Sequence, residues 1–343
     1  MSDADIRMAV EIREGPEAVE GQATLMQASL GELVRRLEAR PPDVVVTCAR
    51  GSSAHAATFG KHLIERYLGI PVAAAAPSVA TVYRRTLNLK DQLFLAVSQS
   101  GRSDDLVELA ASARMAGAVT VALVNAADSP LARTCEIVLP MGAGPELSVA
   151  ATKTVVASMA ALLRLCALWT GDPALEAGLD RLPQRLREAT DLDWSAALPS
   201  FEEAISLVTI GRGPTLAIAR EAGLKLKETS NLHAEAFSGA EFMHGPVTLV
   251  SERYPMLMFM PNDEAAPGLR KLASDLRAKG AALMIAEPGD AAPGRLPALA
   301  PDQPEADAIC LIQSFYGMAV QLASLRGLDV DRPRHLNKVT RTR

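Results

Sequence analysis

Small polar residues form two runs that each follow an apolar segment and precede a helical pattern. Gly51-Ser52-Ser53 follows residues 44–48, and Ser98-Gln99-Ser100-Gly101-Arg102-Ser103 follows residues 92–97. Such a run at a helix N-terminus offers backbone N–H groups, hydroxyl donors and the positive end of the helix dipole, which together bind a phosphate monoester. Serine and glycine also make ordinary turns and N-caps, and either run alone favours that interpretation. Two runs after successive strands favour binding.

A second group of residues has the spacing for proton transfer. Glu221, Lys225 and Glu228 follow one another at intervals of four and three, so one helical face carries all three. Carboxylates separated by an ammonium group can be held in different protonation states, as a proton shuttle requires. A solvated surface helix with ion pairs at i and i+4 produces the same pattern, and the pattern alone favours that alternative.

Two further residues are candidates for proton or amine chemistry. His244 stands immediately before Gly245-Pro246, and a loop histidine titrates near neutral pH, although most such histidines move no protons. Lys338 lies in the C-terminal stretch, where a lysine is usually exposed and inert.

Alternating strand and helix patterns predict the elements that position these residues. A helix over 21–39 ends at Pro41-Pro42. The first half then predicts strands at 44–48, 92–97 and 119–124 and helices at 54–68 and 104–116. The second half predicts strands at 207–210, 256–260 and 281–286 and a helix that ends at Gly280. This order is typical of an α/β fold.

The two halves repeat each other. Arg50-Gly51 pairs with Arg212-Gly213 at an offset of 212 − 50 = 162, and Gly117 pairs with Gly280 at 280 − 117 = 163. Ser98 and Pro261, which end corresponding strands, give 163 as well. The agreement indicates a duplicated α/β domain. The copies differ at the second loop, where SQSGRSDD in the first becomes PNDEAAP in the second.

Composition argues against several classes of protein. With 35 Lys and Arg against 40 Asp and Glu, and 4% aromatic residues, a nucleic-acid binder is not expected. The longest apolar stretch, 155–163, stops at Arg164, and the N-terminus is charged, so we expect neither a membrane partner nor a signal peptide but a cytoplasmic protein. Four scattered cysteines predict reduced, buried thiols, and no metal-ligand spacing or dinucleotide motif occurs, so no metal and no cofactor are expected.

Several motifs in sequence order resemble the SIS (sugar isomerase) domain family. They are SQSGRSDD with the following VALVN, ELSVAATK at 146–153, KLKETSNLHAEAFSGAEFMHGP, the ending DxPRxLxK, and the opening Met8-x-x-Glu11-Ile12-x-Glu14-x-Pro16. Together they cover nearly the whole chain and are similar to the isomerase half of glucosamine-6-phosphate synthase.

The resemblance implies two tandem SIS domains, each a parallel β-sheet flanked by helices in a three-layer, flavodoxin-like α/β/α arrangement. We expect an N-terminal helical segment at 1–40, a first SIS domain with the phosphate loops at 41–175, a second at 195–328, and a tail at 329–343 that closes the active site.

The resemblance also implies roles for individual residues. Glu228 would move the proton between C1 and C2, Glu221 and Lys225 would position the sugar, His244 would assist ring opening, and Lys338 would form a Schiff base with an open-chain ketose. Val149 and Ala150 would line the sugar. The phosphate would be held by the two small polar runs, namely Gly51, Ser52, Ser53, Ser98, Gln99, Ser100 and Ser103.

In this family the histidine loop commonly enters the neighbouring subunit's site, which implies a homodimer with shared active sites. The sequence departs from the synthase at Met243, where the synthase has a lysine, and it shows no N-terminal glutaminase domain. We therefore expect a protein that does not draw ammonia from glutamine.

The expected activity is that of SIS-type glucosamine-6-phosphate deaminases, which convert glucosamine 6-phosphate and water to fructose 6-phosphate and ammonia. Two alternatives stay open: an enzyme acting on galactosamine 6-phosphate or a glycated amino acid 6-phosphate, and a sugar-phosphate sensor without turnover. Retention of Glu228, His244 and Lys338 together favours an enzyme.

Overall fold

The computed structural model describes residues 6–289 and 292–338 of the 343-residue chain. Its residues divide into two compact units. The N-terminal unit comprises 17–146, 153–179 and 337–338 of the described residues, and the C-terminal unit comprises 6–16, 147–152 and 180–336.

The elements alternate between helices and strands along the chain. Up to the end of the first sheet they are α1 (Arg7–Arg13), α2 (Gly15–Ala39), β1 (Val45–Cys48), α3 (Gly51–Leu68), β2 (Val72–Ala74), α4 (Ser78–Thr81), β3 (Leu93–Ser98), α5 (Asp104–Met115), β4 (Val119–Val124), α6 (Pro130–Thr134) and β5 (Ile137–Pro140). Next come α7 (Lys153–Thr170), α8 (Pro173–Thr190), η2 (Ser195–Ala197), α9 (Leu198–Phe201), β6 (Ser206–Gly211), α10 (Pro214–Ser230), β7 (His233–Ser238), α11 (Gly239–Phe242), η3 (Pro246–Leu249), β8 (Pro255–Phe259), α12 (Ala266–Ala278), β9 (Ala282–Glu287), β10 (Arg295–Pro297) and α13 (Pro304–Leu325).

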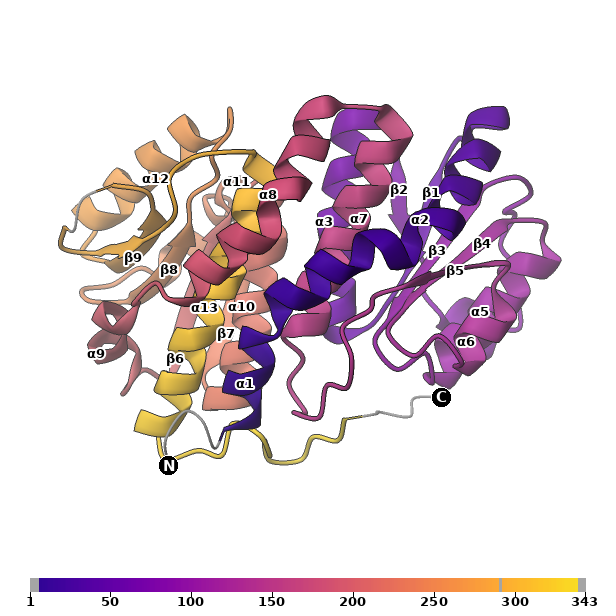
Figure 1. Cartoon of the computed structure of the whole chain (residues 1–343). Helices are drawn as coiled ribbons and strands as arrows, with labels where there is room; N and C mark the ends of the chain where they lie inside the picture. The colour runs from indigo at the N-terminus through magenta and orange to yellow at the C-terminus, as the bar shows by residue number, and fades with distance from the viewer. Residues whose placement is uncertain (1–5, 290–291, 339–343) are drawn as a thin grey trace. The chain divides into compact units, whose positions relative to one another are not determined.

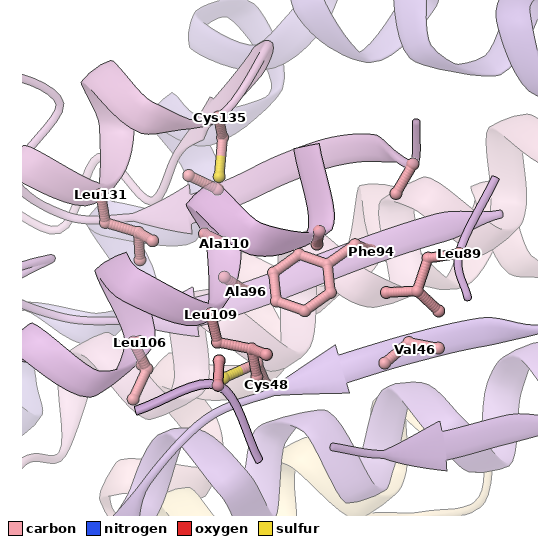
Figure 2. Packing of buried hydrophobic residues seen from close by; sticks show 14 of the residues in the cluster. Val46, Cys48, Leu89, Phe94, Ala96, Leu106, Leu109, Ala110, Leu131 and Cys135 are labelled. Carbon is pink, nitrogen blue, oxygen red and sulfur yellow. The ribbon is translucent and has the colours of Figure 1, made fainter. Parts of the chain in front are cut away.

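The N-terminal unit is a three-layer α/β/α structure. Its five parallel strands have the order β2-β1-β3-β4-β5, with α3 and α7 on one side and α5 and α6 on the other (Figure 1). All residues of β3 are buried, as expected for a parallel strand covered on both faces. Figure 2 shows the Phe94 ring packed beside Leu109 and Ala110 of α5, with the Cys48 and Cys135 thiols in the same cluster.

The C-terminal unit repeats this arrangement. Its parallel strands have the order β7-β6-β8-β9-β10, so in both units the second strand lies at one edge, followed by the first, third, fourth and fifth. The helix α12 covers one face, and α10 packs on the other face and against α13 (Figure 1). The flavodoxin-like α/β class and the duplication predicted from the sequence are confirmed.

The duplication extends to individual buried positions. Each buried residue of α3 has a buried counterpart 162 residues later on α10: Ala56, Ala57, Phe59, Gly60, Leu63 and Ile64 correspond to Ile218, Ala219, Glu221, Ala222, Lys225 and Leu226. On the opposite face, an offset of 163 pairs Leu106, Leu109, Ala110 and Ala113 of α5 with Leu269, Leu272, Ala273 and Leu276 of α12. The two offsets therefore align the domains residue by residue.

Two predicted helices begin earlier in the structure than the sequence indicated. The helix expected at 54–68 begins at Gly51, so Ser52 and Ser53 lie in its first turn, where N–H groups have no intrahelical partner and small polar residues fit well. The helix expected at 21–39 begins at Gly15. The apolar stretch 155–163 lies within α7, which continues past Arg164 to Thr170, because one cationic residue does not interrupt a helix.

Among the described residues, two helices are long and apolar enough to span a membrane. They are α7 and α13, whose most apolar 18-residue windows are 83% and 78% buried within the protein. This degree of burial is typical of core helices.

The predicted domain limits of 1–40, 41–175, 195–328 and 329–343 stay predictions. The first five residues of the N-terminal segment and residues 339–343 of the predicted tail lie outside the described part of the chain.

Candidate active site

The two predicted phosphate loops lie at the carboxyl ends of two inner strands of the N-terminal sheet. The strands β1 and β3 pair in parallel, with Cys48 opposite Ala96, and each is followed by one of the small polar runs. After β1 the chain continues to β2 on one side of this strand pair, and after β3 it continues to β4 on the other side. Ligands of open parallel sheets bind at such a point, beyond the carboxyl ends of the strands. The side chains of Ser52, Ser53, Gln99, Ser100 and Ser103 are all partly exposed there.

The loop after β3 is held in a tight conformation. Gly101 has a φ of 60°, its N–H donates to Ser98 Oγ at 3.1 Å, and the N–H of Arg102 donates to Ser100 Oγ at 3.3 Å. A Cβ at Gly101 would lie 2.1 Å from Ser129 Oγ, so only glycine fits. Ser98 itself is buried, so its hydroxyl shapes the loop, whereas its partly exposed neighbours are accessible to an anion.

An ion pair that the sequence analysis missed joins the two loops. Arg50 donates through Nε and Nη2 to Asp105 Oδ2 at 3.1 and 2.8 Å, and Asp105 is 3% exposed. Asp105 also accepts a hydrogen bond from the N–H of Leu106 at 2.9 Å. Because Arg50 precedes the first run and Asp105 follows the second, this pair fixes one loop against the other. The repeated arginine at 50 and 212 was the signal available in the sequence.

The three charged residues on α10 form a connected chain in the core of the C-terminal unit. Lys225 Nζ lies 3.5 Å from Glu221 Oε1 and also forms an ion pair with Glu228 Oε2. The side chains of Glu221 and Lys225 are fully buried, whereas that of Glu228 is 21% exposed. The Tyr316 hydroxyl donates to Glu221 Oε1 at 3.4 Å from α13. The alternative of a solvated surface helix is therefore wrong for this segment.

The positions that carry the buried charges do not require charge for the fold. Glu221 and Lys225 correspond to Phe59 and Leu63 of α3, which are equally buried and apolar. Burying an ion pair stabilises a fold no better than apolar side chains of similar volume, and often less well. Charged groups at such positions, with one carboxylate reaching partly exposed surface, are typical of a functional site.

His244 lies on an exposed turn of the C-terminal unit. Its N–H donates to Glu241 O at 3.0 Å, and Gly245 follows with a φ of 141°. The neighbouring Met243 is 44% exposed. An exposed turn leaves the imidazole accessible.

Lys338 pairs with a buried carboxylate of the N-terminal unit. Its Nζ lies 2.8 Å from Glu146 Oε2, where the lysine side chain is 24% exposed and the glutamate is fully buried. Glu146 also accepts hydrogen bonds from the N–H and the hydroxyl of Thr154, at 3.1 and 2.8 Å. The usual alternative of a solvent-exposed terminal lysine is therefore wrong here. An ammonium group at Lys338 must lose a proton before it can attack a carbonyl.

Three distant segments of the chain meet in the C-terminal unit around residues 147–150. Glu11 accepts hydrogen bonds from the N–H groups of Leu147 and Ser148, and Ser148 Oγ donates to Asp331 at 3.1 Å. Asp331 also accepts from the N–H groups of Arg7 and Met8, at 2.8 and 2.9 Å. Hydrogen bonds thus connect the opening, the ELSVAATK motif and the ending.

This frame positions the two residues predicted to line the sugar. Val149 is half-buried, and Ala150 is 1% exposed. The motifs contain Glu11, Ser148 and Asp331, but the sequence does not indicate that these residues connect them, because the contacts join residues more than 130 positions apart.

The four cysteines are buried thiols that form no disulfide, as predicted. Burial raises the pKa of the Cys48, Cys135 and Cys310 thiols to about 12, so they are neutral and unreactive at physiological pH. Within residues 6–289 and 292–338, no group of three or more His, Cys, Asp or Glu residues is arranged to hold a metal ion.

Comparison with known proteins identifies the family. The SIS domain model matches residues 41–167 and 200–326. The chain is 35% identical, over 94% of its length, to the isomerizing glutamine–fructose-6-phosphate aminotransferase of Symbiobacterium thermophilum, and 33% identical, over 96%, to that of Pseudomonas aeruginosa. It spans 55% and 58% of those two proteins.

Comparison with solved structures indicates the same family. A candidate phosphosugar isomerase of Silicibacter pomeroyi DSS-3 is 44% identical, with a TM-score of 0.89, over 95% of this chain and 100% of that one. The C-terminal domain of the glucosamine-fructose-6-phosphate aminotransferase of Francisella tularensis is 25% identical, with a TM-score of 0.82, over 95% of this chain and 98% of that domain. The chain therefore belongs to the SIS domain family, carries two copies of the domain, and matches the isomerase half of these aminotransferases.

Proposed function

We propose that the protein is a phosphosugar isomerase that acts as a glucosamine-6-phosphate deaminase. It converts glucosamine 6-phosphate and water to fructose 6-phosphate and ammonia. The observation that carries the proposal is the Glu221–Lys225–Glu228 chain, whose two buried members occupy positions where the other copy of the domain is apolar. The names of the curated relatives support the substrate class, because both contain fructose 6-phosphate and an amino transfer.

The hydroxyls and N–H groups of the loops after β1 and β3 bind the phosphate of the substrate. Two loops with several accessible donors suit the three oxygens of a phosphate monoester. The first-turn position of Ser52 and Ser53 adds the N–H groups at the start of α3. Gln99, Ser100 and Ser103 supply the remaining side-chain donors.

The chemistry then proceeds by proton transfer. His244 assists ring opening, which exposes the C1 aldehyde. Glu228 removes the proton from C2 and returns it to C1, giving a C2 imine. Lys225, which forms an ion pair with Glu228, holds this carboxylate in position for the step. Glu221, fixed by Tyr316, holds Lys225 in place.

Loss of ammonia completes the reaction. The Lys338 amine attacks C2 of the imine and displaces ammonia, forming a Schiff base with the ketose. Water then hydrolyses this Schiff base to fructose 6-phosphate and regenerates the lysine. The Lys338 proton must leave before attack, and Glu146 is the group placed to accept it.

The proposal is tested by measuring ammonia release from a panel of amino-sugar phosphates without glutamine. We expect release from glucosamine 6-phosphate, with fructose 6-phosphate formed in equal amount, and no change after treatment with a chelator. Galactosamine 6-phosphate and a glycated amino acid 6-phosphate serve as the competing substrates. Faster turnover of either would reassign the substrate, whereas tight binding of all three without turnover would identify a sensor.

We further propose that the protein forms a homodimer in the cytoplasm in which His244 serves the partner's site. A His244→Ala chain mixed with a Glu228→Gln chain should then regain part of the activity, because each mixed dimer contains one intact site. Sedimentation equilibrium establishes the dimer first. Absence of recovery after verified subunit exchange places both groups in one chain's site.

A further inference from the structure

A cavity lies at the place in the C-terminal unit that corresponds to the phosphate loops of the N-terminal unit. Its volume is about 480 Å³, and it is lined by Arg212 after β6 and by Glu264 and Ala265 before α12. The strands β6 and β8 are the neighbours from which the chain runs outward in opposite directions, as β1 and β3 are in the other sheet. This is the position at which open parallel sheets bind ligands.

The cation at this cavity lacks the partner that its counterpart has. In the N-terminal unit, the Arg50 guanidinium is neutralised by Asp105 at 2.8 Å. The offset of 162 aligns Arg212 with Arg50, and the offset of 163, fixed by four buried pairs on α5 and α12, aligns Gly268 with Asp105. In residues 6–289 and 292–338, the Arg212 guanidinium makes no ion pair or hydrogen bond, and Gly268 lines the same cavity. Glycine has thus replaced the carboxylate and left the guanidinium facing open space.

The other charged groups of the lining define what fits beside Arg212. Lys271 pairs with Asp275 at 2.9 Å, so these two groups largely cancel. Glu264 also lines the cavity and already has a partner within the protein. The uncompensated charge of the lining is therefore the Arg212 guanidinium, which favours a ligand with an anionic group.

We propose that the C-terminal SIS domain binds a small phosphomonoester at Arg212, as a second site separate from the phosphate loops of the N-terminal unit. The site itself rests on the geometry of the C-terminal unit, whereas the choice of a phosphomonoester rests on the proposed function. The duplicated domain has retained the location of a ligand site while changing its donors.

The probe for the test is glucitol 6-phosphate, which carries the phosphate and hydroxyls but has no carbonyl to react. Titration calorimetry on the full chain should show two sites per chain. Arg212→Ala should weaken one site roughly 10- to 100-fold, because a hydrogen-bonded charged partner is lost. Gly268→Asp should remove the same site by restoring the carboxylate found in the other copy, and a Cβ at Gly268 meets no atom within 4 Å, so the fold accommodates it.

Matched variants control for charge and backbone changes. Arg270→Ala removes an arginine that lies on α12 and does not line the cavity, and so controls for the loss of positive charge. Gly268→Ala changes the same position as Gly268→Asp but adds no charge. Both should keep two sites. A single site in the wild-type chain, or two full-strength sites in both Arg212→Ala and Gly268→Asp, would overturn the proposal. Two sites for inorganic phosphate but one for glucitol 6-phosphate would show that the cavity takes a bare anion only.

This test is independent of turnover. If glucosamine 6-phosphate is not a substrate but Arg212→Ala still loses one binding site, the proposed activity fails and the second site stands. If turnover is normal and only one site is found, the second site fails and the proposed activity stands.

Discussion

The two SIS domains have the same strand order and the same buried helix positions, yet they carry charge and hydroxyl groups in opposite places. The N-terminal copy has serines in the loop after its third strand and apolar Phe59 and Leu63 in the helix after its first strand. The C-terminal copy has PNDEAAP in that loop and Glu221 and Lys225 in that helix. The comparison teaches that the topology is maintained by buried positions, whereas the chemistry depends on a few exchanges at those positions and in the loops.

The cost of burying charge explains why the presence of Glu221 and Lys225 on α10, in place of apolar residues, indicates function. Each buried charge costs several kcal/mol of desolvation, which its partner only partly offsets. The apolar residues of α3 meet the same packing requirement without this cost. The C-terminal copy therefore carries a charge network that its fold does not require.

The largest expected effect comes from Glu228, whose position in the N-terminal copy is occupied by Arg66. Glu228→Gln keeps the shape of the side chain and removes the base, so turnover should fall roughly 10²- to 10⁴-fold. Ground-state binding should change little, because the phosphate loops supply most of the anchoring. Initial rates and calorimetric affinity are measured together, with Glu235→Gln, an exposed carboxylate on β7, as the control. Near-normal turnover, or loss of binding as complete as the loss of turnover, would disprove the role of the base.

The next effect concerns the stability of the buried pair. Lys225→Leu introduces the residue of the other copy but leaves Glu221 buried without its ammonium partner, which should cost about 3–5 kcal/mol. The double variant Glu221→Met/Lys225→Leu should be less destabilised than this single variant, since both positions become apolar as they are in α3. Urea denaturation followed by the fluorescence of Trp194, which is buried in the same unit, measures both.

Lys227→Met on the same helix serves as the control, because Lys227 is exposed and pairs with a backbone carbonyl. It should change the free energy of unfolding much less than Lys225→Leu. Equal losses in the single and double variants would show that Glu221 and Lys225 do not act as a pair.

A smaller effect is expected at the hydroxyl-rich loop. Ser100→Ala removes one donor to a charged phosphate, a loss of roughly 1.5 to 3 kcal/mol in substrate binding. The Michaelis constant should rise about 10- to 150-fold while the turnover number changes little. Ser29→Ala on α2, outside both loops, provides the comparison. A fall in turnover number with an unchanged Michaelis constant would remove Ser100 from phosphate binding.

The smallest effect is a gain in stability. Gly268 lies inside α12, where the N-terminal copy has Asp105, and a Cβ there has open space. Gly268→Ala should raise the free energy of unfolding by up to about 1 kcal/mol through helix propensity, with turnover unchanged. Thermal unfolding measures the change. A loss of stability would show that the cavity wall at Gly268 is under steric constraint.

The sequence predicted the fold well because its signals are local. Alternating apolar runs and helix-ending glycines at Gly117 and Gly280 located the strands, and their spacing revealed the duplication. The helix start at Gly51 was placed three residues late, because small polar residues are equally compatible with a loop and with the first turn of a helix. The roles of the predicted site residues, by contrast, stay predictions.

What the sequence by itself determined is the alternation of elements, their repetition, and the residue types available for phosphate binding and proton transfer. Only the tertiary structure decided which charged residues are buried, because burial depends on the helices that pack from elsewhere in the chain. Glu221 contacts Tyr316 across 95 residues, and Lys338 contacts Glu146 across 192. Spacing can place three charges on one helical face, but only packing removes that face from water, and the desolvation that follows distinguishes a charge network from a surface ion pair.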